Sequence, residues 1–355
     1  MRRVAGIILI ILLSVSLFAI LHRSLNWGHH SSQENRVRGV SSNALPRGNK
    51  AITAVEYQRM LNVGINVDWM TFSRVSHRYF QWRSKGVSVP EYFREKGFSN
   101  VRIRMGKDVL TNKTALLQLA EIVNDTLEVG LIPIITYTAP ELRGNPLSKA
   151  AQEHFVKWWE TVANYFQGYP YLLSYDLLIE SSGGIKSHPE VLNKVYSETI
   201  REIRKIDPYR LIFVTPSHVS SPFYLNELNV TNDGYTLAEW HIYASGPRGC
   251  SYNESYVENA LSVALNWSKK TAIPTWLGAW RPNSYPKDRE RGEEPSCPME
   301  LELNFTKAMV SALSKAGIPY DINSDVHFFN ITCLKWDENQ DEVLELILHP
   351  QRTAR

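Results

Sequence analysis

The chain has 355 residues, of which 43% are hydrophobic and 21% are charged, and its formal net charge is +3. This length allows one large domain with a full core, and the balance is that of an ordinary globular protein. A charge this small gives no reason to expect a nucleic-acid partner. We expect the protein to be a monomer.

The first 23 residues predict a transmembrane signal anchor. Arg2 and Arg3 precede an uncharged run, Val4–Leu21, in which Leu, Ile and Val predominate. A helix of this length spans about 27 Å, close to the thickness of the hydrocarbon core of a bilayer. With the arginines on the inside, the protein would be a single-pass protein of the cell membrane with its main domain extracellular. A cleaved signal peptide, which would give a secreted protein, is the alternative.

Residues 24–50 are polar and rich in Ser, Asn, Arg and Gly, which predicts a flexible stalk between the membrane and the domain. The remaining chain contains more Asn-x-Ser/Thr acceptor sites than the roughly three that chance would give, and these favour an extracellular glycoprotein. There are seven such sites, at Asn112, Asn124, Asn229, Asn253, Asn266, Asn304 and Asn330.

Residues 51–349 alternate between short apolar runs and amphipathic stretches, which predicts a (β/α)8 TIM barrel of the α/β class, followed by a tail at 350–355. Near-continuous apolar runs are typical of strands that are buried on both faces of a parallel sheet. A doubly wound open sheet is the alternative, but no glycine-rich phosphate-binding turn follows the first run. The eight runs are Gly64–Trp69, Val101–Met105, Leu131–Tyr137, Leu172–Glu180, Leu211–Pro216, Leu237–Tyr243, Ile273–Trp280 and Ile318–Asn323.

Helices are expected between the runs, where apolar residues recur at helical spacing and Gly130 and Gly317 provide C-terminal stops. In a barrel of this kind the chemistry takes place at the C-terminal ends of the strands, so the residues there are the site candidates. The predicted helices are Pro90–Lys96, Thr114–Val129, Ala150–Phe166, Pro189–Ile206, Tyr256–Lys269, Met299–Lys315 and Glu342–Leu348, with a weaker one at Phe223–Leu228.

Glu180 ends the fourth apolar run. Partial burial of a carboxyl group there would raise its pKa, which suits a residue that donates a proton to a leaving group. A helix cap or a salt bridge is the structural alternative.

His241 and Tyr243 end the sixth run. Alternation along a strand points Glu239, His241 and Tyr243 toward the barrel interior, where the histidine and the tyrosine could bond a carboxylate or a substrate hydroxyl. Glu239 would lie about 7 Å deeper, which favours a structural role for it. A satisfied polar layer inside the barrel is the alternative for His241 and Tyr243.

Basic and aromatic side chains stand near the same rim. Arg102 on the second run could hold a nearby carboxylate ionised, and Arg104, which has the same facing, competes for that role. Tyr137, Trp276 and Trp280 could stack on the apolar faces of sugars, unless they pack in the core.

These strand-end residues resemble those of glycoside hydrolase family 5, a family of retaining cellulases and mannanases, over about residues 60–335. The resemblance implies a β-linked polysaccharide or oligosaccharide as the substrate, with Glu180 as the acid/base and Arg102 as the active-site arginine. Four segments are similar to family motifs: Gly97–Ile103 to the second-strand entry, Ser174–Glu180 to the acid/base strand, His241–Tyr243 to His-x-Tyr, and Ile273–Gly278 to the approach to the nucleophile.

The sequence departs from the family pattern at its most important position, because the nucleophile falls on Ala279. Retaining hydrolysis needs two carboxylates about 5–5.5 Å apart, and a methyl group cannot attack a sugar. The family's Asn-Glu-Pro is replaced by Ile179–Ser181, its histidine pair by Tyr137–Thr138, and its eighth-strand tryptophan is replaced near Asn323.

Three functions are compatible with this pattern. Another carboxylate, Glu239, Glu141 or Asp108, could serve in hydrolysis, either as a nucleophile or as the base of an inverting enzyme. Alternatively, the protein is an inactive pseudo-glycosidase that binds glycans, or a transglycosylase or synthase that uses an activated donor.

Three cysteines, Cys250, Cys297 and Cys333, allow one disulfide. Cys250–Cys297 is the expected pair, and the absence of any bridge is the alternative. Their spacing does not suit a zinc site, and we expect neither a metal nor a cofactor.

Overall fold

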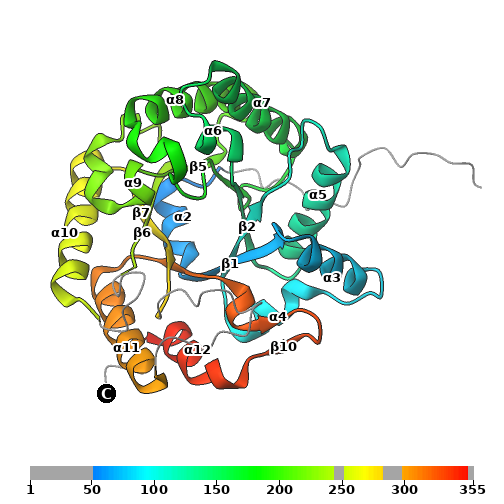
Figure 1. Cartoon of the computed structure of the whole chain (residues 1–355), viewed down its shortest axis with the longest axis vertical. Coiled ribbons are helices and arrows are strands. Elements are labelled where there is room, and N and C mark those ends of the chain that lie inside the picture. Colours follow the sequence, from blue (N-terminus) through cyan, green and yellow to red (C-terminus); the bar gives the residue numbers. More distant parts are fainter. Residues whose placement is uncertain (1–50, 244–251, 283–297, 351–355) are drawn as a thin grey trace, which may run out of the picture. The chain divides into compact units, whose positions relative to one another are not determined.

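Eight parallel strands form a closed barrel surrounded by helices in the computed structural model, which describes residues 51–243, 252–282 and 298–350 (Figure 1). The predicted (β/α)8 barrel is confirmed, and each of the eight apolar runs overlaps one strand. The strands are β1 (Val63–Met70), β2 (Asn100–Met105), β3 (Ile132–Tyr137), β4 (Ser174–Asp176), β5 (Leu211–Val214), β6 (Thr236–His241), β7 (Thr275–Trp280) and β8 (Tyr320–Asn323).

The barrel closes between its first and last strands. Ile65 of β1 is the register partner of Val101 on β2 and of Ile322 on β8. Register shifts interrupt the β6–β7 pairing next to His241 and the β7–β8 pairing before Trp280. Such irregularities re-aim side chains, and these two lie at the C-terminal rim, where the site candidates are.

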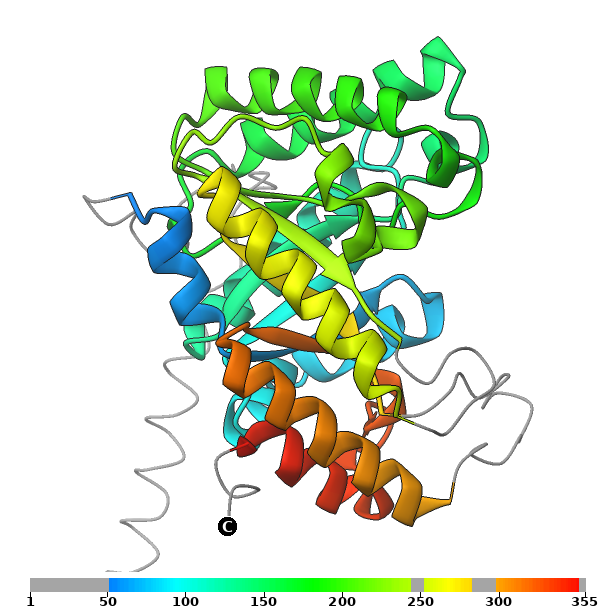
Figure 2. The same cartoon turned by 90° about the vertical axis from the view of Figure 1, so that its left-hand side faces the viewer.

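Most predicted helices agree with the structure to within one or two residues, and the weak one at 223–228 is a 3-10 helix, η2 (Pro222–Glu227). Figure 2 shows α10 and α11 as long neighbours on the barrel wall. The helices are α2 (Ala54–Leu61), α3 (Ser73–Arg83), α4 (Val89–Lys96), α5 (Lys113–Glu128), α6 (Pro140–Gly144), α7 (Lys149–Phe166), α8 (Pro189–Ile206), α9 (Ser217–Ser220), α10 (Glu254–Thr271), α11 (Met299–Ala316) and α12 (Asp341–Leu348).

Helix α2, which the sequence analysis missed, packs against one end of the barrel. Thr53 and Glu56 form a capping box at its start, a signal that the sequence does contain. The Tyr57 hydroxyl donates to the Leu172 carbonyl (2.8 Å) and contacts the Ser174 hydroxyl (2.9 Å), just before and at the start of β4. Since strands begin at this end, α2 leaves the opposite, C-terminal end for a site.

The apolar core has two parts. The larger lies between the strands and the surrounding helices, and the smaller fills the barrel interior near α2 with residues such as Leu211, Phe213 and Trp276. Polar side chains, among them Arg102 and Glu239, occupy the interior closer to the C-terminal ends and are fully buried.

Several predictions fall outside the described residues. These are the anchor at 1–23, the stalk at 24–50, the tail at 350–355 beyond its first residue, and the Cys250–Cys297 pair. Among the helices that are described, none is long and apolar enough to cross a membrane. Cys333 is described and is a free, exposed thiol.

Candidate functional site

A cavity of about 190 Å³ opens at the C-terminal ends of the barrel strands. It brings together six of the site candidates named from the sequence. They are Arg102, Arg104, Glu180, His241, Tyr243 and Ala279. These side chains come from β2, β6, β7 and the segments that follow β4 and β6, so the strand-end rule located the cavity.

Arg102 is the centre of a buried charge cluster below this cavity. Its guanidinium is fully buried and forms ion pairs with Asp176 (2.5 Å) and Glu239 (2.9 Å). It also donates hydrogen bonds to the carbonyls of Gly278 (3.0 Å) and Ile179 (2.8 Å). Burial raises the pKa of Asp176 to about 7 in spite of the neighbouring arginine. Arg102 thus ties β2 to β4, β6 and β7.

His241 lies between two carboxylates. Its Nε2 is 2.5 Å from Glu239 Oε1, and its Nδ1 is 3.5 Å from Glu180 Oε1. Burial lowers the pKa of His241, but the charge of Glu239 and the hydrogen bonds to both carboxylates outweigh burial and raise this pKa to about 9. The ring is therefore an imidazolium at neutral pH.

Glu180 differs from the expectation in two respects. Strand β4 ends at Asp176, so Glu180 stands four residues beyond it, in the segment before the 3-10 helix η1 (Gly183–Ser187). Burial raises the pKa of Glu180, but His241, Ser182 and Arg143 together outweigh burial and lower the pKa below its usual value. The predicted rise in pKa is therefore corrected, and Glu180 is ionised at neutral pH.

Local packing explains why position 278 is a glycine and places Ala279 in the cavity wall. A Cβ at Gly278 would overlap the carboxylate of Glu239, so a glycine is required where β7 passes this buried group. Ala279 follows and is paired in register with His241 across the β6–β7 irregularity. Its methyl group lines the cavity at the position where the family resemblance expects a carboxylate.

A second polar chain crosses the cavity wall near β8. Arg104 donates to Asn323 Oδ1 (2.6 Å), and Asn323 donates to the Tyr243 hydroxyl (2.8 Å). The Nε of Arg104 is 3.4 Å from Asp68 Oδ1. Asp325 is a neighbour of Asp68. Burial and the charge of Asp68 raise the pKa of Asp325 to about 8, so Asp325 is largely protonated at neutral pH.

Three predicted aromatic platforms do not line the cavity. Tyr137 is buried and stacks on Trp158, with 4.0 Å between the ring centroids. Trp276 is buried in the barrel interior below Arg102, and Trp280 is buried against Tyr320. The structure therefore gives these rings packing roles and does not place them where a sugar could stack.

No substitute for the missing carboxylate lines the cavity among the described residues, where Glu180 is the only acidic side chain. Glu239 is fully buried in its ion pairs. Glu141 accepts a hydrogen bond from Tyr137 (3.1 Å), and Asp108 lies 3.4 Å from His154. Neither of the last two reaches the cavity wall.

Other residues that line the cavity were missed as site candidates. Asn66 and Thr71 come from β1 and its end, and Thr138 and Arg143 follow β3. Asn66 lies inside a predicted strand and not at its C-terminal end, so the strand-end rule did not indicate it. Arg143 belongs to the short helix α6, for which the apolar pattern gives no signal.

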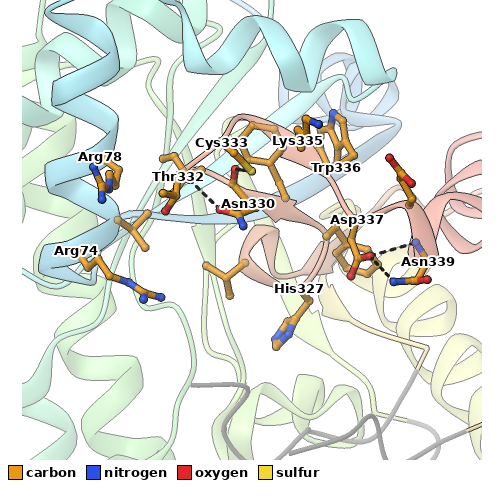
Figure 3. Close-up of a pocket in the computed structure, with 16 residues that line it drawn as sticks. Arg74, Arg78, His327, Asn330, Thr332, Cys333, Lys335, Trp336, Asp337 and Asn339 are labelled. Atoms are coloured by element: carbon orange, nitrogen blue, oxygen red, sulfur yellow. Dashed lines mark hydrogen bonds between the residues drawn. The ribbon is translucent and has the colours of Figure 1, made fainter. Parts of the chain in front are cut away.

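A larger cavity, of about 550 Å³, lies beside α3 (Figure 3). Arg74 and Arg78 of α3 face the hairpin of β9 (Phe329–Asn330) and β10 (Lys335–Trp336) across it. This cavity is not formed by the central strand ends and contains none of the predicted site residues. Within the described ranges, no group of three or more His, Cys, Asp or Glu side chains could hold a metal ion.

Residues 63–294 match the family model described as cellulase, glycosyl hydrolase family 5. The chain belongs to glycosyl hydrolase family 5. Endoglucanase H of Acetivibrio thermocellus is 24% identical over 326 residues, which cover 85% of this chain and 34% of that protein. The chain thus spans about a third of the length of this relative.

Solved structures share the family 5 fold. Endoglucanase Cel5A of Thermotoga maritima has a TM-score of 0.69 at 19% identity, covering 82% of this chain and 100% of its own. A hyperthermophilic endo-β-1,4-glucanase solved in complex with substrate has a TM-score of 0.68 at 21% identity, covering 82% and 99%. Subunit Z of the Clostridioides difficile cellulose synthase has a TM-score of 0.65 at 20% identity, covering 80% and 99%.

Proposed function

We propose that this family 5 protein binds a β-linked glycan at the barrel mouth and does not hydrolyse it by the two-carboxylate retaining route. One observation carries the proposal: Ala279 and Glu180 line the same cavity, and Glu180 is its only carboxylate among the described residues. Without a nucleophile no glycosyl-enzyme intermediate forms, and loss of a covalent nucleophile lowers turnover by orders of magnitude.

The ionisation of Glu180 supports the same conclusion. In a retaining site the charge of the nucleophile helps to keep the acid protonated, because two nearby carboxylates raise the pKa of one of them. A methyl group at Ala279 has no such effect, and His241 lowers the pKa of Glu180. Glu180 is therefore poorly suited to protonate a leaving group at neutral pH.

The nature of the ligand is inferred from the relatives. The family model is that of a cellulase, and the similar proteins include endoglucanases and an endo-β-1,4-glucanase. The cavity keeps an arginine, a histidine and a tyrosine, Arg102, His241 and Tyr243, at the strand ends. These support a β-linked polysaccharide or oligosaccharide as the ligand.

Glycosyl transfer is a second candidate, because an ionised Glu180 beside Ala279 is in the correct state for it. Glu180 would take the proton of an acceptor hydroxyl as that oxygen forms a bond to the anomeric carbon. The leaving group of an activated donor, such as a glycosyl phosphate, would depart with its electron pair from the opposite face. Incubation with an α-glycosyl fluoride and an acceptor tests this: a longer glycan supports transfer, and fluoride release without one contradicts it.

Assays of binding and of hydrolysis distinguish the main proposal from an active hydrolase. We expect the purified full chain to bind β-glucan oligosaccharides in calorimetry and to release no reducing sugar from β-glucans, mannans and xylans. We expect Ala279→Glu to gain measurable release, and Ala279→Gln, which matches it in size, to remain silent. Release by the native protein that disappears in Glu180→Gln would overturn the proposal.

We also propose that residues 1–23 anchor the protein in the cell membrane with the barrel outside. Two arginines before an uncharged run and seven Asn-x-Ser/Thr sites support this topology. Carbonate extraction of membranes tests it together with protease treatment of intact cells. Retention after carbonate and cleavage by external protease are expected, and a barrel released by carbonate or protected from protease would contradict the topology.

A further inference from the structure

We propose that the barrel-mouth cavity selects a glycan unit that carries an anionic substituent, a carboxylate or a sulfate ester, held by Arg104 and Arg143. This inference rests on the proposed glycan binding and narrows the ligand to acidic glycans. Arg104 stands on β2, and Arg143 on α6 after β3, so the two guanidinium groups reach the cavity from neighbouring parts of its wall.

The side chains that line the cavity are mainly cationic. Three arginines and the imidazolium of His241 line it, but only one described carboxylate, Glu180, does so. The carboxylates that pair with Arg102, namely Asp176 and Glu239, are fully buried and do not line the cavity. A ligand therefore meets more positive than negative groups, although the cluster as a whole is nearly balanced.

Among the cations that line the cavity, Arg143 is the one whose charge is least compensated by carboxylates. It donates hydrogen bonds to two neutral oxygens, the Thr138 carbonyl (3.4 Å) and the Ser182 hydroxyl. It forms no ion pair with any described carboxylate, although its charge helps to lower the pKa of Glu180. A planar guanidinium with neutral partners keeps its charge for a ligand and suits the two oxygens of a carboxylate or sulfate.

Arg104 is held in place at the rim. Its terminal nitrogen donates to Asn323, which is itself bonded to Tyr243. Its only described carboxylate partner is Asp68, at 3.4 Å from Nε, and this Nε makes no hydrogen bond in the described structure. A guanidinium that these contacts already hold in place loses little conformational entropy when a ligand binds.

The cavity lacks the features that favour a neutral sugar. Tyr243 is the only Phe, Tyr or Trp among the described residues that line it, and the hydroxyl of Tyr243 is already bonded to Asn323. Stacking of sugar faces on rings therefore contributes little, and charged donors dominate the recognition. A volume of about 190 Å³ is below the roughly 300–1,000 Å³ of drug-sized sites and suits a single sugar unit with its substituent.

Calorimetry on the full chain with three β-1,4-linked hexasaccharides tests the inference. The probes are a neutral cello-oligosaccharide, an oligoglucuronate and a sulfated cello-oligosaccharide. At low salt we expect at least one acidic probe to bind about tenfold more tightly than the neutral one, the scale of one charge-assisted hydrogen bond. The advantage should shrink at high salt, because part of the charge is exposed to solvent. The tighter acidic probe identifies the substituent.

Two variants distinguish a specific contact between the ligand and Arg143 from an effect of the protein's net charge. Arg143→Gln keeps a hydrogen-bonding side chain, and we expect its loss of affinity for the acidic probe to exceed its loss for the neutral probe by about tenfold. Lys157→Gln makes the same change of charge on an exposed side chain of α7 and should alter neither affinity.

The outcomes separate this inference from the proposed function. Equal affinities of the native protein for neutral and acidic probes would overturn the anionic selectivity and leave glycan binding standing. The same loss for both probes in Arg143→Gln would also overturn it. Failure of all three probes to bind would instead overturn the proposed function.

Discussion

The imidazolium of His241 makes a contribution to stability that a change of pH should remove. The pKa of His241 is about 9 in the folded protein and about 6.5 in an unfolded chain. A group whose pKa is raised by folding stabilises fully below its unfolded pKa, and this stability is lost as the pH rises through the folded pKa. The loss of stability therefore falls between about pH 6.5 and pH 9.

The size of the effect follows from the two pKa values. The difference of about 2.5 units, at 1.36 kcal/mol each, corresponds to about 3 kcal/mol of unfolding free energy. The side chain of His241 is only 4% exposed, so solvent screens the interaction little. The contribution belongs to the imidazolium between Glu180 and Glu239, and a neutral side chain at this position lacks it at every pH.

Urea unfolding of the native protein and of His241→Gln at pH 6.5 and pH 9.5 measures this contribution. We expect the native advantage over the variant to shrink by about 3 kcal/mol between the two pH values. Groups outside this charge cluster that titrate in this pH range, such as Asp325, are expected to cancel in the difference. A difference between native and variant that does not change with pH would refute the account of His241.

Two substitutions test the buried cluster below the cavity. Gly278→Ala should destabilise the protein by about 1–3 kcal/mol, because the new methyl group displaces Glu239. As the control, Gly168→Ala adds a methyl group in open space and should change the unfolding free energy little. Arg102→Met should cost about 3–5 kcal/mol in urea unfolding, because it leaves buried carboxylates without their cation. A loss below 1 kcal/mol in either case would contradict this view of the cluster.

The barrel could be predicted from the sequence because its strands are buried from end to end. Each strand then appears as an apolar run, and the helices between them repeat apolar residues on one face. The strand-end rule also brought Arg102, His241 and Glu180 to one cavity. The capping box at Thr53 would have added α2.

Side-chain facing at the rim could not be predicted, because alternation fails where the register shifts. In β7, Gly278 contacts Glu239 in the interior, yet the next residue, Ala279, lines the cavity, and Trp280 packs outward against Tyr320. The irregular pairing around these residues breaks the two-residue period of the strand, so the facing of Trp280 does not follow from its place in the apolar run.

The ionisation state of Glu180 also could not be predicted without the structure. Burial, which an apolar run indicates, raises the pKa of a carboxyl group. The groups that reverse this shift come from other elements: His241 from β6 and Arg143 from α6. Their approach to Glu180 depends on tertiary packing that no local pattern encodes.

Labelling with oxygen-18 determines whether this family 5 cavity binds a glycan without cleaving it. The full chain is incubated with a β-1,4-linked hexasaccharide in water enriched in oxygen-18, and the products are read by mass spectrometry. We expect an intact hexasaccharide and no labelled shorter glycan. Labelled products from the native protein that are absent from Glu180→Gln would contradict it.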